Sequence, residues 1–240
     1  MADFILVHGG LHGASCWDLL RPELERAGHR TFAMDLPIDR PNAWMDDYAQ
    51  SALAAVEGVA SDNAYLVGHS MGGMVIPRMA FQRPKARLIF LCAGFAHSNE
   101  AEHAEGLDAT RPDFFSKLTI DSQGCLTMTA ENAIALFYQD VEPELAKWAV
   151  STLRPQWHES FAKVGPVSPY AERVAHVIYT TEDEIIDPAK HRAMAEKRFG
   201  IKPIALPGGH SPFLSHPAEL ADVLNRIVVA DMAGERYSPN

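Results

Sequence analysis

A serine between glycines, Gly68-His69-Ser70-Met71-Gly72, has the residue types for nucleophilic chemistry. The apolar run 64–67 before it predicts a buried strand, and the apolar spacing over 74–81 predicts a helix. Between a strand and a helix, G-x-S-x-G is typical of a nucleophile elbow, which presents a serine hydroxyl above a sheet edge. A Cβ at position 68 or 72 would collide with the neighbouring strand or helix. An ordinary glycine-rich loop is the other interpretation of the pentapeptide, and its setting favours a nucleophilic Ser70.

A serine hydroxyl is a weak nucleophile at neutral pH, so it needs a base to take its proton. The chain has 11 histidines, most of which we expect on the surface or in packing roles. His210 differs because it follows an expected strand over 202–206 and a turn that contains Gly208 and Gly209. In elbow hydrolases the chain order is serine, acid, histidine. We therefore expect His210 to be the base.

The base needs a carboxylate on its other ring nitrogen. An expected strand over 174–181 is followed by four acidic residues, Glu182, Asp183, Glu184 and Asp187. A solvated acidic loop is the plain interpretation for most of them, and Asp187 before a proline is typical of a helix N-cap. Asp183 lies just past the strand and is our choice for the acid.

The transition state of acyl transfer also needs donors for an oxyanion. The backbone N–H of Met71, directly after the serine, is one candidate. The loop after the first expected strand supplies the second, and the N–H of Gly10 is favoured there. His8 and His12 in the same loop either hydrogen-bond it or fill space.

Other kinds of site find little support. The pair Gly9-Gly10 is not a dinucleotide motif, because G-x-G-x-x-G is absent. His97 and His103 fall in a polar stretch without metal-ligand spacing, and no H-E-x-x-H occurs. We expect neither a metal nor a cofactor.

The elements that must position these groups alternate along the chain. Expected strands are 4–7, 30–36, 64–67, 87–92, 174–181 and 202–206, and expected helices are 17–27, 46–60, 74–81, 188–199 and 217–230. This alternation predicts an α/β fold with a mostly parallel six-stranded sheet flanked by helices. Between 94 and 173 no strand-length apolar run appears, and helices are expected at 113–118, 131–138, 143–152 and 158–164. We expect a core of residues 1–94 and 174–240 with a helical cap, 95–173.

Apolar residues of this region and of the first loop could line a substrate pocket. They are Leu11, Phe95, Phe114, Leu126, Phe137, Trp148, Leu153 and Trp157. Most are expected only to pack the cap against the core, but as a set they favour a small apolar or aromatic group on the substrate.

Charge and composition argue against several classes of binding partner. The 240 residues carry a formal net charge of −10, and no Lys/Arg cluster occurs, which argues against a nucleic-acid or anionic-membrane partner. No apolar run reaches the roughly 18 residues that a membrane span needs. Three cysteines without a C-x-x-C pair and a first strand near residue 4 favour a cytoplasmic protein without a signal peptide. Monomer and homodimer both stay open.

Together these residues resemble the α/β-hydrolase superfamily, and within it the plant methylesterase and hydroxynitrile-lyase group with its bacterial esterase relatives. The segments that carry the likeness are Val7–Trp17 (V-H-G-x-x-H-G-x-x-x-W), Ala33–Leu36, the elbow, Thr181–Ile185 and Gly208–His210. The resemblance assigns Asp183 as the triad acid and implies hydrolysis of a small ester.

Lyases of this group carry a lysine after the catalytic histidine and a threonine after the first-loop histidine. Ser211 and Gly9 occupy these positions, so lyase chemistry is not expected. The sequence thus predicts an esterase that works through an acyl-enzyme. A lactonase or thioesterase with the same triad, a C–C bond hydrolase, and a slow-turnover ligand receptor of the same fold remain alternatives.

Overall fold

A six-stranded sheet forms the centre of the computed structural model, which describes residues 1–60, 62–160, 165–235 and 237. Its strands are β1 (Asp3–Val7), β2 (Arg30–Ala33), β3 (Ala64–His69), β4 (Arg87–Leu91), β8 (Val174–Thr180) and β9 (Ile204–Leu206). They lie in the order β2-β1-β3-β4-β8-β9, and all neighbours are parallel. All six expected strands are confirmed.

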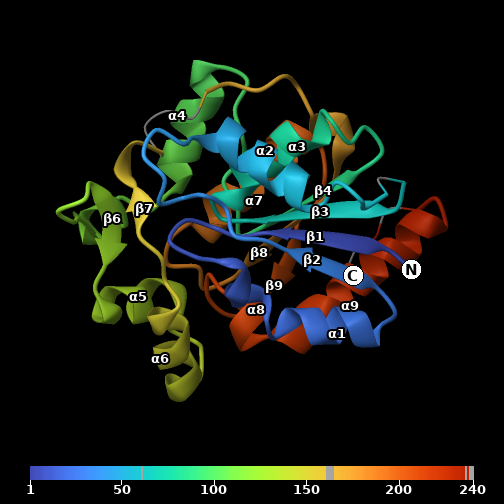
Figure 1. Ribbon diagram of the computed structural model, residues 1–240. Helices are drawn as coiled ribbons and strands as arrows, with labels where there is room; N and C mark the ends of the chain where they lie inside the picture. The colour runs from blue at the N-terminus through green and yellow to red at the C-terminus, as the bar shows by residue number, and fades with distance from the viewer. Residues whose placement is uncertain (61, 161–164, 236, 238–240) are drawn as a thin grey trace.

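Helices cover both faces of this sheet, which is why the central strands are almost continuously apolar. Figure 1 shows α2 (Met45–Ala55) and α3 (Gly72–Ala80) above the sheet, with α1 (Leu20–Arg26), α8 (Pro212–Ser215) and α9 (Pro217–Met232) below it. Helix α7 (Pro188–Phe199) joins β8 to β9. The expected helix 17–27 is divided into a 3₁₀ turn, Ala14–Trp17, and α1.

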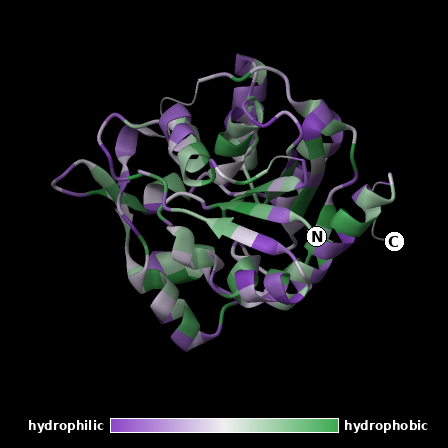
Figure 2. Cartoon of the chain, turned by 45° about the vertical axis from the view of Figure 1, so that its right-hand side comes forward, coloured by the Kyte–Doolittle hydropathy of each residue, from purple (hydrophilic) through white to green (hydrophobic). Residues whose placement is uncertain are grey.

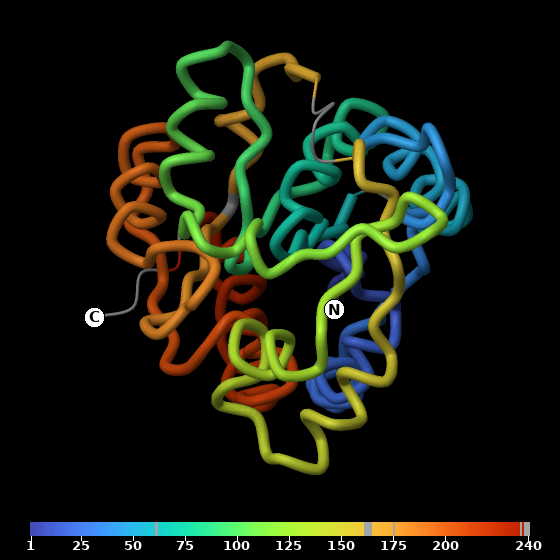
Figure 3. The backbone as a smooth tube through the Cα atoms, turned by 90° about the vertical axis from the view of Figure 1, so that its left-hand side faces the viewer, coloured from blue at the N-terminus to red at the C-terminus, as the bar shows by residue number. Residues whose placement is uncertain are grey.

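The segment between β4 and β8, which we call the inserted segment (residues 95–173), is not purely helical. It contains α4 (Glu100–Ala109), α5 (Ala130–Phe137) and α6 (Pro143–Ser151), and 3₁₀ turns at Phe115–Lys117, His158–Ser160 and Ala171–Arg173. It also contains an antiparallel sheet of β5 (Leu118–Ile120), β6 (Cys125–Met128) and β7 (Gln156–Trp157). Figure 3 looks onto this segment from the left of Figure 1.

The expectation of an all-helical cap is therefore corrected. Strands β5 and β7 have three and two residues, too few to produce an apolar run that a sequence pattern reveals. The helix expected at 113–118 is a short 3₁₀ turn that leads into β5, and α4 was not predicted. The helices expected at 131–138 and 143–152 are confirmed as α5 and α6, whereas 161–164 lie outside the described residues.

Apolar residues are concentrated in the strands of the sheet, as the colouring of Figure 2 shows, and the buried residues of the flanking helices are mostly apolar. The three cysteines are free and buried. No helix among the described residues is long and apolar enough to span a membrane. The carboxyl ends of the parallel strands point toward the inserted segment, and loops at such an edge commonly carry the site of an α/β protein (Figure 1).

Candidate active site

The turn between β3 and α3 has the geometry of a nucleophile elbow. Ser70 has a φ of +50°, in the left-handed region that residues other than glycine rarely adopt. A Cβ on Gly68 would lie 2.6 Å from the carbonyl oxygen of Gly72, and one on Gly72 would collide with the carbonyl of Val7 in β1. The close approach of the two chain segments therefore requires glycine at both positions, as expected.

Backbone hydrogen bonds hold Ser70 in this strained conformation. Its N–H donates to the carbonyl of Leu91 at 3.2 Å, and its own carbonyl accepts from Gly73 and Gly94, both at 3.1 Å. A left-handed serine costs about 1–3 kcal/mol, which such contacts must offset. The serine side chain is left at the surface of a cavity rather than in the core.

His210 and Asp183 form a buried pair at the carboxyl ends of β9 and β8. Nδ1 of His210 lies 2.8 Å from Oδ2 of Asp183, and both side chains are almost wholly buried. Because a carboxylate oxygen only accepts, Nδ1 is the donor to Asp183, and Nε2 is the ring nitrogen left free to act as a base. Nε2 is buried and has no hydrogen-bond partner among the described residues, so Ser70 and His210 are not hydrogen-bonded here.

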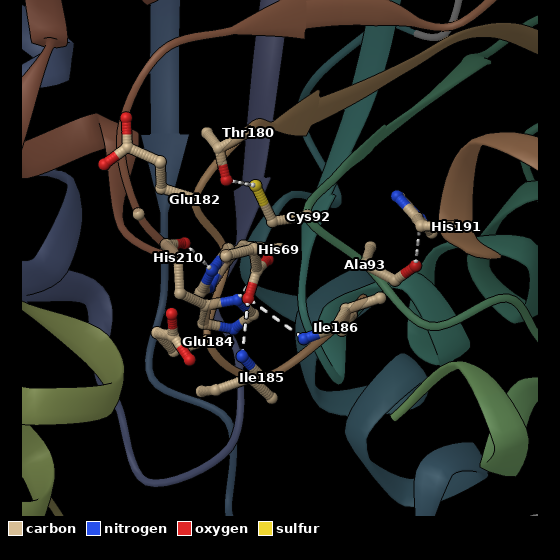
Figure 4. A network of polar contacts seen from close by, with 12 residues as sticks. His69, Cys92, Ala93, Thr180, Glu182, Glu184, Ile185, Ile186, His191 and His210 are labelled. Atoms are coloured by element: carbon tan, nitrogen blue, oxygen red, sulfur yellow. Dashed lines mark hydrogen bonds and ion pairs between the residues drawn. The ribbon is translucent and has the colours of Figure 1, made fainter. Parts of the chain in front are cut away.

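The second oxygen of Asp183 is also occupied. Oδ1 accepts from the backbone N–H groups of Ile185 at 2.8 Å and Ile186 at 2.9 Å (Figure 4). Burial alone would raise the pKa of Asp183, but the electrostatic interaction with His210 and the hydrogen bonds from His210, Ile186 and Ile185 outweigh it and lower the pKa. The carboxylate is therefore ionised across the neutral range.

The other acidic residues of this loop have different surroundings. Asp187 accepts from the N–H of Lys190 at 3.0 Å and is the N-cap of α7, as expected. Glu182 and Glu184 are exposed. Among the four carboxylates, Asp183 is the one that contacts His210.

His69 contacts the backbone and the ring of His210. Its Nε2 donates to the backbone carbonyl of His210 at 2.9 Å, and the two rings lie 4.7 Å apart. The ring of Phe213 packs against His69 at the same centroid distance. Burial, followed by the unfavourable interaction that a second charge would have with the His210 and His12 rings, lowers the pKa of His69 far below its usual value, so its ring is neutral. Its role is to anchor the His210 backbone, in line with the packing role expected for it.

A cavity of about 110 Å³ adjoins Ser70, with Gly10, Leu11 and Met71 on the same side. The opposite walls come from the inserted segment and from the loop that carries Asp183. Their residues are Phe95, His97, Glu102, His103, Gly106, Leu107, Thr110, Phe114, Phe115, Leu118, Phe137, Ile185 and Ile186, with Met74 and Gly94 from the core. Apolar and aromatic side chains dominate this lining.

The residues expected to bind substrate fall into two groups. Leu11, Phe95 and Phe137, together with Phe114, line the cavity. Outside its lining are Leu126 on β6, Trp148 on α6 with 36% of its surface exposed, Leu153 packed against the core, and Trp157, whose ring contacts His158.

Sequence reasoning missed the wall that α4 provides. His103, Gly106 and Leu107 lie on successive turns of this helix and reach the cavity, and His97 packs against His103 with ring centroids 4.4 Å apart. Helix α4 has no apolar periodicity, and it is polar on most sides. An antiparallel bridge between Thr110 and Ile186 connects the C-terminal end of α4 to the loop that carries Asp183.

Comparison with known proteins agrees with this architecture. The profile described as "Alpha/beta hydrolase family" matches residues 4–223. A carbendazim hydrolyzing esterase of Nocardioides sp. (strain SG-4G) is 27% identical over 93% of this chain and 98% of its own length. Methylesterase 9 of Arabidopsis thaliana is 39% identical over 82 residues, 31% of this chain and 32% of that protein, so this match spans about a third of the relative.

Among solved structures, polyneuridine aldehyde esterase superposes with a TM-score of 0.78 at 23% identity, over 93% of this chain and 98% of that one. At this identity the likeness concerns the fold. The profile covers most of the chain, and a relative that matches over most of its length is named as an esterase. The chain therefore belongs to the alpha/beta hydrolase family.

Proposed function

We propose that this protein is a serine hydrolase that cleaves small carboxylic esters through an acyl-enzyme, with Ser70, His210 and Asp183 as its triad. The observation that carries the proposal is the buried 2.8 Å hydrogen bond between His210 and Asp183, which leaves Nε2 of His210 without a partner. A buried nitrogen lone pair is costly unless something uses it. Catalytic hydrogen bonds are often long in unliganded enzymes and shorten when substrate binds.

In the first half of the reaction, Nε2 of His210 takes the hydroxyl proton as Ser70 Oγ attacks the ester carbonyl. The backbone N–H groups of Gly10 and Met71 stabilise the oxyanion of the tetrahedral intermediate. The protonated imidazole then gives its proton to the departing alcohol oxygen as the ester C–O bond breaks. Asp183 stays ionised and stabilises the imidazolium, which its lowered pKa favours.

In the second half, water attacks the acyl group on Ser70 while His210 takes a proton from it. Collapse of the second tetrahedral intermediate releases the carboxylic acid and returns the proton to the serine oxygen. Met71 is the N-cap of α3, so the partial positive charge at the helix N-terminus adds to the stabilisation of both oxyanions. The reaction needs no further group.

The inserted segment acts in this proposal as a cap on the core formed by residues 1–94 and 174–240. Phe114, Phe137 and Leu11 line the cavity that adjoins Ser70. Their apolar surfaces favour an aromatic or short aliphatic group on the acyl or alcohol side of the ester. The relatives named as a carbendazim esterase and a methylesterase support small esters as the substrate class.

A panel of p-nitrophenyl esters, with acyl chains from acetyl to decanoyl and an aromatic acyl group, tests this proposal in stopped-flow kinetics. We expect a burst of about one p-nitrophenol per chain with short esters, because the acyl-enzyme accumulates. Lactones and thioesters are assayed in parallel, and a higher kcat/KM for one of them would identify a lactonase or a thioesterase. A protein that binds the esters but releases no p-nitrophenol would instead be a receptor, and the proposal would be wrong.

A further inference from the structure

The loop that supplies Gly10 is held by a network of side chains that the triad does not use. Two peptide groups flank the Cα atom of Gly10. The first joins the Gly9 carbonyl to the Gly10 N–H, and the second joins the Gly10 carbonyl to the Leu11 N–H. The direction of the proposed oxyanion donor depends on how both groups are oriented, because a trans peptide is planar.

His8 orients the first peptide group. Its Nδ1 lies 2.8 Å from the Gly9 carbonyl, and its Nε2 accepts the Leu36 N–H at 3.0 Å. Nδ1 therefore carries the only ring proton and donates it to Gly9. Burial lowers the pKa of His8 to about 4, so this neutral form persists at neutral pH.

His12 holds the carbonyl side of the second peptide group. Its Nδ1 lies 2.7 Å from the Gly10 carbonyl and must donate, since a carbonyl only accepts. Burial lowers the pKa of His12 to about 3, so Nε2 keeps its lone pair. The hydroxyl of Tyr138, at the end of α5, donates to this Nε2 at 2.9 Å. A residue of the inserted segment thus occupies the second ring nitrogen of His12 and stabilises the tautomer that donates to Gly10.

Gln156 holds the N–H side of the same peptide group. Its Oε1 accepts the Leu11 N–H at 3.0 Å, and its Nε2 lies 2.7 Å from Ser160 Oγ and 3.0 Å from the sulfur of Met71. The side chain is fully buried. One glutamine on β7 therefore contacts the residues on both sides of the proposed oxyanion hole.

The backbone at Leu11 shows why such a hold is needed. Leu11 has a φ of +61°, a left-handed conformation that a residue with a branched side chain rarely adopts. Its N–H donates to Gln156, and its carbonyl accepts from the Arg154 N–H at 2.7 Å. Both polar groups of this strained residue are thus bonded to the inserted segment, one to Gln156 in β7 and the other to Arg154 two positions before it.

We propose that Gln156 and Tyr138 are positioning residues that fix the Gly10 peptide groups, so that the docked inserted segment completes the oxyanion hole. The inference rests on the proposed function, because it takes Gly10 and Met71 as the oxyanion donors. Gln156 accepts a hydrogen bond from the Leu11 N–H. Tyr138 donates to His12, which in turn donates to the Gly10 carbonyl. Neither side chain lines the substrate cavity, so neither selects the substrate by contact.

The test compares Gln156→Met and Tyr138→Phe with wild type in steady-state ester hydrolysis. An ångström of misplacement can cost on the order of 100-fold in rate. We expect kcat to fall about 10- to 100-fold for Gln156→Met and about 3- to 10-fold for Tyr138→Phe, with KM changed less than about two-fold, since only transition-state contacts are lost. Affinity for a trifluoromethyl ketone, which forms a tetrahedral adduct on the serine, should fall in parallel with kcat/KM.

Tyr170→Phe is the matched control. Tyr170 is also a buried tyrosine of the inserted segment, and its hydroxyl donates to the Ala96 carbonyl at 2.7 Å. It should lower thermal stability about as much as Tyr138→Phe and leave kcat unchanged. If Gln156→Met does not fold, the two tyrosine variants decide the question alone.

Two outcomes would count against different parts of the account. Normal kcat in both Gln156→Met and Tyr138→Phe, with lowered melting temperatures, would show a purely structural role and overturn the inference. Ester hydrolysis that survives in Ser70→Ala would overturn the proposed function instead.

Discussion

Two cavities of similar size lie at opposite ends of the same sheet. The one beside Ser70, at the carboxyl ends of the strands, has a volume of about 110 Å³, and one at the amino ends has about 130 Å³. In the second cavity the polar groups satisfy each other: Asp231 pairs with Arg87 and accepts from Tyr65, and Lys85 pairs with Asp62 at 2.9 Å. Size does not distinguish the two ends.

A strained residue and an unpartnered histidine nitrogen do distinguish them. At the carboxyl end Nε2 of His210 is buried without a partner among the described residues, and Ser70 is held at a positive φ. Strain and missing partners cost stability and persist where the surrounding structure enforces them, which is commonly at functional sites. The contrast predicts that side-chain changes at the carboxyl end affect rate, while changes at the amino end affect only stability.

The largest effect is expected from Ser70→Ala. Loss of the nucleophile should lower kcat for p-nitrophenyl esters about 10⁴- to 10⁶-fold, because only oxyanion stabilisation and binding remain. Arg87→Met at the amino-end cavity is the matched control and should keep kcat within about two-fold while lowering the melting temperature. A large loss of rate in Arg87→Met would break the comparison.

Asp183→Asn should come next, with kcat lowered about 10⁴-fold. The new amide can still accept from Ile185 and Ile186, but it would favour the His210 tautomer that carries its proton on Nε2. Steady-state kinetics and a thermal melt measure rate and folding separately. Glu184→Gln, on the exposed neighbouring carboxylate, should be without effect; a loss of less than ten-fold in Asp183→Asn would remove Asp183 from the triad.

Gly106→Leu probes the wall of the carboxyl-end cavity. A Cβ at this position of α4 meets no atom within 4 Å, so the leucine side chain can enter the cavity. We expect kcat/KM to fall about ten-fold or more for aromatic and long-chain acyl esters, and to change little for p-nitrophenyl acetate. A ten-fold loss corresponds to roughly the free energy of burying one to two methylene groups. Gly58→Leu is the control, because a Cβ at Gly58 also meets no atom within 4 Å but Gly58 does not line the cavity. It should leave kcat/KM unchanged for every ester. Equal effects on all esters would place the acyl group elsewhere.

The last prediction concerns the dependence of stability on pH and not the rate of hydrolysis. Burial lowers the pKa of His8 and of His191 to about 4 and that of His12 to about 3. Below pH 6.5 these histidines bind protons in the unfolded chain but stay neutral in the folded protein. The free energy of unfolding therefore falls on acidification, by about 1.4 kcal/mol per pH unit for each histidine, until the pH reaches its pKa in the folded protein. Urea unfolding at pH 7 and 5.5 measures this loss.

His191→Gln supplies the control for this measurement. A glutamine can still donate to the Ala93 carbonyl, which His191 Nε2 contacts at 2.8 Å, but it does not titrate. The loss of stability between the two pH values should shrink by about 1.4 kcal/mol in this variant. The same loss in both proteins would mean that His191 is not held neutral.

The core and the inserted segment differ in how far the sequence predicts them. Ser70, Gly68 and Gly72 follow one another within a local turn, so their geometry is a short-range property that a pattern captures. Asp183 and His210 each come directly after a strand, and parallel strands bring such loops to one edge. The contact between Asp183 and His210 was therefore predictable.

The cavity wall and the loop contacts were less predictable because they depend on tertiary packing. Helix α4 is polar on most sides, so nothing in its pattern marked Leu107 or His103 as lining residues. Strand β7 has two residues, and the hydrogen bond from Leu11 to Gln156 spans 145 positions of the chain. The sequence left His12 open between a polar and a packing role, and its contacts with Gly10 and Tyr138 support the polar one.

The most direct test of the central claim is covalent labelling with a serine-directed phosphonate, followed by mass mapping of the modified peptide. A single adduct should form on the peptide that contains Ser70, with loss of ester hydrolysis in proportion to labelling, and Ser70→Ala should remain unlabelled. An adduct on another residue, or full activity after stoichiometric labelling, would contradict the account.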